Sequence, residues 1–260
     1  MIAAPAILQA AASLAQSHHA PYDPSHDWHH VHRVRLQALR LARSLSPSPD
    51  LLVVELSALF HDLLDAKYLR LEPGQKPPAA REHLEPFWAS FSDEVVSERQ
   101  RRLVERVIEN VSYSKEVKRI KAGEETDWHS ECLELHCVQD ADKLDAIGAF
   151  GILRCAAYSG ASSVPLFVPP SSSRLSSSPS SLGSTSIAPA SAKSSAIDHF
   201  HEKLLRLEGM MKTPLGRAMA RKRTEMMREF VGEVEREWNE ISGGDEVVVG
   251  GALEVPEGGR

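Results

Sequence analysis

The chain has 260 residues, of which 42% are hydrophobic, and it carries a formal charge of −6 at pH 7. This length and apolar content suffice for one substantial buried core, and although length alone would allow two domains, we expect one. The negative charge excludes a general electrostatic attraction to nucleic-acid polymers or anionic membranes. Any phosphate group would therefore have to be recognised by cations placed at particular positions.

Neither a membrane anchor nor a secretory signal is expected. No apolar segment approaches the roughly 18–20 residues that span a bilayer. The alanine-rich beginning, residues 1–14, lacks a basic region, and we expect it to form an amphipathic first helix. The cysteines are Cys132, Cys137 and Cys155, an odd number without zinc-finger spacing. A reduced compartment, cytosol or nucleus, is the simpler expectation.

Apolar residues three to four positions apart, among them Val31 and Val34, predict a helix from Trp28 to Leu45 with one core face. His30 lies beside this face, near the start of the helix. The imidazole of His30 is therefore expected to point toward the interior of a helical bundle.

Serine and proline at residues 46–49 end this helix, and Asp50 is the predicted N-cap of the next one, which contains the apolar run 51–60. His61 and Asp62 stand at its C-terminal end. An isolated His-Asp pair is common, but here two polar groups follow an apolar run, where burial without partners is costly.

Prolines and a glycine predict a loop over residues 72–80, and apolar residues at helical spacing predict a helix over 95–111. A further helix is expected to begin near Asp140. Residues two positions apart on a helix project about 200° apart, so Asp140 and Asp142 cannot easily share a face. We therefore assign Asp142 to a shared site and Asp140 to an N-cap or to contacts behind that site.

About half of residues 169–195 are serine. Such a composition cannot bury enough apolar surface to offset the entropy of ordering, so we expect a disordered insertion. Helical spacing resumes over 197–234, and the glycine-rich residues 243–260 are expected to form a flexible tail. Strand signals are scarce. The predicted fold is all-α, with a single helical-bundle domain formed by residues 1–168 and 196–242.

The candidate metal site combines His61 and Asp62 with two more distant residues. Adjacent helix residues project about 100° apart, so the pair can share one ion only if other helices supply further ligands. His30 and Asp142 are the candidates. Imidazole and carboxylate ligands without thiolate suit a catalytic divalent ion such as Mn²⁺, Mg²⁺, Fe or Zn²⁺, with open positions for phosphate or water.

The order of these four residues resembles the HD superfamily of metal-dependent phosphohydrolases. Flanking segments are similar to small stand-alone HD hydrolases, a branch that includes manganese-dependent nucleoside triphosphate pyrophosphohydrolases; these segments are residues 26–34, 60–68, 107–116, 138–149 and 198–207. The resemblance covers about residues 20–165 and 196–238. It implies an HD-type helical bundle in which the four residues hold a divalent ion, with Mn²⁺ preferred.

The activity implied by the resemblance is hydrolysis of a small phosphate substrate, foremost a nucleoside triphosphate cleaved to monophosphate and pyrophosphate. A phosphomonoesterase or phosphodiesterase acting on another small substrate is the alternative enzyme. A helical interaction module stapled by the metal is the non-enzymatic alternative, but a structural site would prefer closed coordination. The sequence does not specify the oligomeric state.

Further residues are candidates for roles around the ion. Related HD hydrolases can place a second acidic residue where Asp65 stands, so Asp65 is the candidate to orient or deprotonate the attacking water; a solvated surface carboxylate is equally consistent with the sequence. Arg33 is expected to orient the ligand carboxylates. Candidates for phosphate contact are Lys67, Lys115 and Lys143, each of which is equally consistent with a solvated surface lysine; Lys203, in the later matching segment, is a weaker candidate.

Overall fold

The computed structural model describes residues 6–64, 78–169 and 195–242. Regular structure within these ranges is entirely helical, which confirms the all-α prediction. The predicted insertion, apart from its two end residues, and the predicted C-terminal tail lie outside the described residues. None of the described helices is long and apolar enough to cross a membrane.

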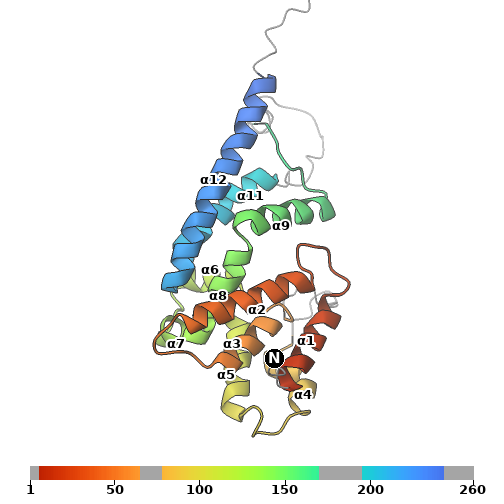
Figure 1. Cartoon of the computed structure of the whole chain (residues 1–260), viewed down its shortest axis with the longest axis vertical. Helices are drawn as coiled ribbons and strands as arrows, with labels where there is room; N and C mark the ends of the chain where they lie inside the picture. The colour runs from red at the N-terminus through yellow and green to blue at the C-terminus, as the bar shows by residue number, and fades with distance from the viewer. Residues whose placement is uncertain (1–5, 65–77, 170–194, 243–260) are drawn as a thin grey trace, which may run out of the picture.

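The described helices pack into one elongated bundle (Figure 1). Helices α1, α3, α4 and α5 lie at the end that holds the N-terminus, α9, α11 and the C-terminal part of α12 lie at the other end, and α2 and α8 lie between them. In chain order the elements are α1 (Ala6–His19), α2 (Trp28–Arg43), α3 (Leu51–Phe60), α4 (Ala80–Trp88), α5 (Glu98–Asn110), α6 (Tyr113–Ala122), α7 (Asp127–Glu131), α8 (Leu133–Asp145), α9 (Gly148–Ala161), α11 (Ala196–Glu202), the 3-10 helix η2 (Leu204–Met210) and α12 (Pro214–Ser242).

Helix α3 is the central element of the N-terminal half, and it packs against α1, α2, α5 and α8. Its faces contribute to two hydrophobic clusters: Ala58 belongs to the cluster around α2, α8 and α12, and Leu59 to the cluster around α1, α4 and α5. A helix buried over most of its surface needs apolar residues on most of its faces, which explains why residues 51–60 are apolar except for Glu55 and Ser57. Because α3 ends at Phe60, the next residues emerge inside the bundle.

The predicted starts of α2 and α3 are confirmed, whereas α2 ends at Arg43 rather than at Leu45, and α3 ends at Phe60, before His61 and Asp62. Helix α2 begins at Trp28, and Asp50 caps α3 by accepting hydrogen bonds from the backbone N–H groups of Leu52 and Val53 at 3.0 and 3.3 Å. The helix predicted over residues 95–111 corresponds to α5. The sequence pattern of these segments is therefore sufficient to define the two helices that deliver His30 and the His61-Asp62 pair.

The prediction that a helix begins near Asp140 is wrong. Helix α8 begins at Leu133, and Asp140 lies inside it. The buried Asp140 carboxylate instead accepts hydrogen bonds from the backbone N–H groups of Lys212 and Thr213 and from the Thr213 hydroxyl, all at 2.7–3.1 Å. It thereby caps the beginning of α12 from a neighbouring helix, which no local sequence pattern reports.

Gly216 makes this cap possible. A Cβ atom at Gly216 would lie 2.5 Å from Asp140 Oδ2 and 2.6 Å from Thr213 Oγ1, whereas a Cβ at Gly232 in the same helix would meet nothing within 4 Å. Both neighbours of Gly216 are fixed by their mutual hydrogen bond. The absence of a side chain at Gly216 is therefore a packing requirement.

We predict that Gly216→Ala and Gly232→Ala have opposite effects on stability. Alanine favours a helix by about 1 kcal/mol over glycine, and Gly232→Ala should gain up to that amount. Gly216→Ala should instead lower the free energy of unfolding by about 1–3 kcal/mol, because it overpacks the buried cap. Urea unfolding of both variants checks the prediction, and stabilisation by Gly216→Ala would contradict this role of the cap.

Candidate metal centre

Four side chains from three parts of the fold converge on one point. His30 projects from α2, His61 and Asp62 directly follow α3, and Asp142 projects from α8. The Nε2 atoms of His30 and His61 are 3.2 Å apart, and Asp62 Oδ2 lies 3.5 Å from the first and 3.3 Å from the second. Asp142 Oδ1 lies 3.8 and 3.9 Å from the same two nitrogens. The structure thus brings together all four predicted ligands.

The hydrogen bonds of both histidines fix the direction of their lone pairs. His61 Nδ1 lies 2.9 Å from the carbonyl oxygen of Ala58, which can only accept, so this nitrogen carries the proton. His30 Nδ1 donates in the same way to Asp145 Oδ2 at 2.8 Å. Each Nε2 atom therefore presents a lone pair to the point where the carboxylates converge.

The donor set fits a divalent ion. Metal–ligand bonds of about 2.0–2.2 Å separate neighbouring ligand atoms by roughly 3–3.5 Å, close to the observed spacings. Without positive charge, two lone pairs and two carboxylates would repel one another. The pKa of His61 reflects the same need for positive charge. Burial by itself lowers this pKa, but the adjacent Asp62 carboxylate raises it to about 9.

Asp145 is a site residue that the sequence analysis missed. Its buried carboxylate accepts hydrogen bonds from His30 Nδ1, from Arg33 at 2.8 and 3.0 Å, and from Arg154 at 3.3 Å. Burial raises the pKa of this carboxyl, but the hydrogen bonds from His30 and Arg33 outweigh it and hold the pKa below its usual range. Arg33, which was expected to orient the ligand carboxylates, contacts Asp145 instead.

Two further histidines near the centre were also missed. His19 is buried at the end of α1, its Nδ1 atom donates to the carbonyl oxygen of His26 at 2.8 Å, and it interacts electrostatically with His30, His61 and Asp62. The buried Nε2 atoms of His18 and His19 have no hydrogen-bond partner among the described residues. Burial lowers the pKa of both residues, that of His18 to about 4, so both imidazoles are neutral at pH 7.

The predicted phosphate-contact lysines have different surroundings. Lys115 is exposed and donates to the carbonyl oxygen of Glu109 at 3.0 Å. Lys143 is buried and pairs with Glu116 at 2.6 Å, a carboxylate that it shares with Lys212. The contacts of Lys115 and Lys143 are thus with protein groups outside the four-residue cluster.

The remaining candidates divide into two groups. Asp65 and Lys67 lie outside the described residues. Lys203 is described: its Nζ atom lies 4.7 Å from the centre of the Tyr113 ring, and its side chain borders a cavity between α9 and α11. Lys203 is therefore the one predicted lysine that the described structure places beside a cavity.

The sequence and fold match known proteins over most of the chain. The HD domain family model matches residues 27–147, a range that contains all four converging residues. A curated relative, the uncharacterized protein YpgQ of Bacillus subtilis, is 31% identical over 212 residues, which cover 82% of this chain and 84% of the relative.

Solved structures extend the match to nearly the whole fold. A Lactobacillus plantarum protein matches with 28% identity and a TM-score of 0.66, covering 92% of this chain and 100% of its own. Bacillus subtilis YpgQ in complex with ADP is 26% identical with a TM-score of 0.62, and the match covers 88% of this chain and 97% of YpgQ. An HD-superfamily hydrolase from Bacillus thuringiensis is 25% identical with a TM-score of 0.58, and the match covers 89% of this chain and 96% of its own. With its ligand geometry and these relatives, the chain belongs to the HD superfamily of metal-dependent phosphohydrolases.

Proposed function

We propose that this protein hydrolyses nucleoside triphosphates between the α- and β-phosphates, giving a monophosphate and pyrophosphate, with Mn²⁺ as its preferred ion. The observation that carries the proposal is the asymmetric exposure of the centre. The side chains of His30 and His61 are each 1% exposed, whereas those of Asp62 and Asp142 are 17% and 27% exposed. The carboxylate side is therefore open to a phosphate and a water molecule.

The chemistry of the four residues suits phosphate hydrolysis. A divalent ion bound by His30, His61, Asp62 and Asp142 would screen the negative phosphate oxygens and acidify water. The protein's part is to hold the two imidazoles in one tautomer and one orientation, through Asp145 for His30 and through the Ala58 carbonyl for His61. Arg33 and Arg154 hold Asp145 in turn.

A nucleotide is favoured over another small phosphate substrate by one finding on a relative: YpgQ of Bacillus subtilis has been crystallised in complex with ADP. Phosphate recognition in this chain is assigned to Lys67 and Lys203. Asp65 is assigned to orient or deprotonate the attacking water, because it follows the ligand Asp62 by three positions. A phosphomonoesterase or phosphodiesterase remains the alternative reaction.

The products separate these reactions. We predict that the Mn²⁺-loaded protein, incubated with a panel of nucleoside triphosphates, releases pyrophosphate and a monophosphate, which ion-exchange chromatography resolves. Asp62→Ala should abolish both bound metal and turnover, because it removes a ligand atom while leaving the helix core intact. Release of orthophosphate alone would contradict cleavage at the α–β bond, and full activity of a folded Asp62→Ala protein would reveal a contaminating enzyme.

We predict that Asp65→Asn separates chemistry from metal binding. If Asp65 activates the water, the variant should keep its metal and its fold but lose turnover by about 10²–10⁴-fold, the range for losing a general acid-base group. The Michaelis constant should change much less. Metal content and kinetics measured on one preparation check this, and loss of the metal would place Asp65 among the ligands instead.

We predict that Asp145→Asn weakens Mn²⁺ binding by about 10–100-fold, because His30 loses the carboxylate that fixes its tautomer and raises its basicity. Glu55→Gln is the matched control, since it also removes a carboxylate from an arginine ion pair, between Arg35 on α2 and Glu55 on α3, without contacting the ligands. Calorimetric titration of both variants with Mn²⁺ measures the effect. Equal affinities would show that Asp145 has only a structural role.

A further inference from the structure

A hollow lies between α9 and α11, outside the metal centre. Its larger part has a volume of about 380 Å³ and its smaller part about 180 Å³. The two parts share Cys155, Tyr158 and His199 as lining residues, so they adjoin each other, and together they are called here the α9–α11 cavity. Its total size falls in the range of small-molecule binding sites.

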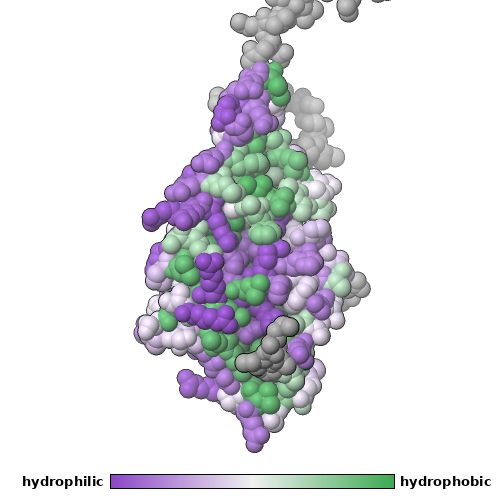
Figure 2. Space-filling view, viewed as in Figure 1, coloured by the Kyte–Doolittle hydropathy of each residue, from purple (hydrophilic) through white to green (hydrophobic). Residues whose placement is uncertain are grey.

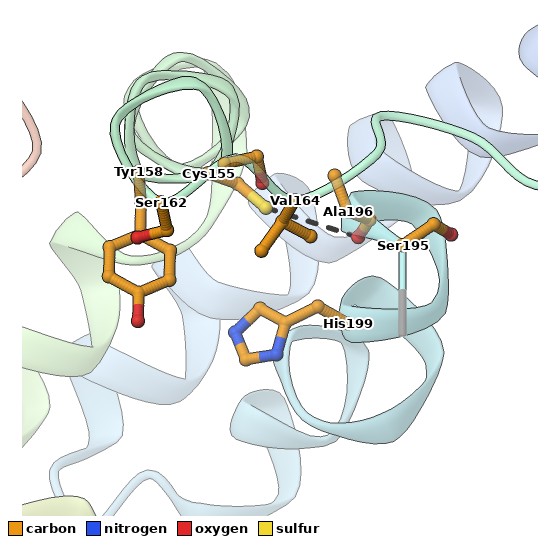
Figure 3. A pocket seen from close by; sticks show the side chains of 8 residues that line it. Cys155, Tyr158, Ser162, Val164, Ser195, Ala196 and His199 are labelled. Atoms are coloured by element: carbon orange, nitrogen blue, oxygen red, sulfur yellow. Dashed lines mark hydrogen bonds between the residues drawn. The ribbon is translucent and has the colours of Figure 1, made fainter. Parts of the chain in front are cut away.

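The larger part of the cavity has walls suited to a flat ring. Tyr158 from α9 and His199 from α11 direct their rings into the same space, which Val164 also lines (Figure 3). Ser159 and Ser162 add hydroxyl groups to its lining, whereas the hydroxyl of Ser195, which also lines it, is hydrogen-bonded to Asp198 at 2.8 Å. Aromatic faces stack on any nucleobase, and nearby hydroxyls can bond to the polar edge of the base.

The smaller part of the cavity leads toward the metal centre. It is lined by Ser25, His26 and Arg154. The His26 ring lies 6.1 Å from the ring of the ligand His30 and 6.2 Å from the ring of Tyr158, so one ring separates the centre from the cavity wall. A nucleotide likewise has one sugar between its base and its α-phosphate.

The charges along the cavity match the polarity of a nucleotide. Arg154 and Lys203 both line the smaller part, next to the metal centre, whereas the larger part has only neutral lining groups besides His199. An anionic end therefore fits near the metal and a neutral, flat end fits between α9 and α11.

We propose that the α9–α11 cavity holds the base of the nucleotide substrate, with its sugar and α-phosphate beside Arg154 and Lys203. The proposal rests on the proposed function, since it takes a nucleotide as the substrate. Tyr158 is the base-stacking residue of this site. Its side chain is 47% exposed, so it contributes little to the core and can be replaced without unfolding the protein.

The test compares a ligand that has a base with one that has none. Binding of ADP and of inorganic tripolyphosphate to the Mn²⁺-loaded protein is measured by calorimetry. Tyr158→Ala should raise the Kd of ADP about tenfold or more, the effect of losing one stacked base, and leave tripolyphosphate binding within about twofold. Tyr158→Phe should restore ADP binding. Leu153→Ala is the control, because Leu153 lies on the same helix, is 66% exposed and does not line the cavity.

A second variant tests the same cavity by filling it instead of removing a lining side chain. Val164→Trp fills the larger part and should weaken ADP binding while sparing tripolyphosphate, and melting curves verify the fold of each variant. Unchanged ADP binding in both variants, or an equal loss for ADP and tripolyphosphate, would overturn the assignment of the base site. A wild-type protein that hydrolyses no nucleotide would instead overturn the proposed function, whatever the variants bind.

Discussion

The Nε2 atoms of His30 and His61 lie 3.2 Å apart with their lone pairs facing each other, and two carboxylates lie beside them. These groups repel one another unless positive charge lies between them. Much of the N-terminal half of the fold serves to hold this arrangement. Helix α3 is buried over most of its surface and ends where His61 and Asp62 begin, so its apolar packing fixes where the pair can lie. The packing of α2 and α8 against α3 supplies the other two ligands.

The hydrogen bonds behind the ligands extend this order outward. The Asp145 carboxylate accepts hydrogen bonds from His30, Arg33 and Arg154. These bonds join α2, α8 and α9 around one buried carboxylate. Arg154 also donates to the backbone of Ser25 at 2.7 Å and lines the cavity between α9 and α11. One network therefore connects the orientation of a metal ligand to the wall of the proposed nucleotide site. The end of the molecule that holds α9 and α11 shows hydrophobic side chains on its surface beside the polar α12 (Figure 2).

The four proposed ligands could be selected from the sequence because each lies in a regular helix or directly after one, where spacing decides the face. Asp142 points to the centre and Asp140 points to α12, as their angular separation requires. The cap that Asp140 forms could not be predicted, since its partners lie 72 and 73 positions away in the chain. Asp145 was missed because its partners are also distant in the chain. One signal was present: Asp145 follows Asp142 by three positions and Arg33 follows His30 by three, a spacing that keeps each pair on one helix face. The α9–α11 cavity depends on how helices on either side of the serine-rich segment meet, which periodicity does not report.

Anomalous diffraction from crystals soaked in Mn²⁺ tests the central claim most directly. Data collected above and below the manganese absorption edge locate the ion without any assumption about its ligands. The account predicts one strong difference peak within bonding distance of His30 Nε2, His61 Nε2, Asp62 and Asp142. A peak elsewhere in the molecule, with none among these four side chains, would contradict it.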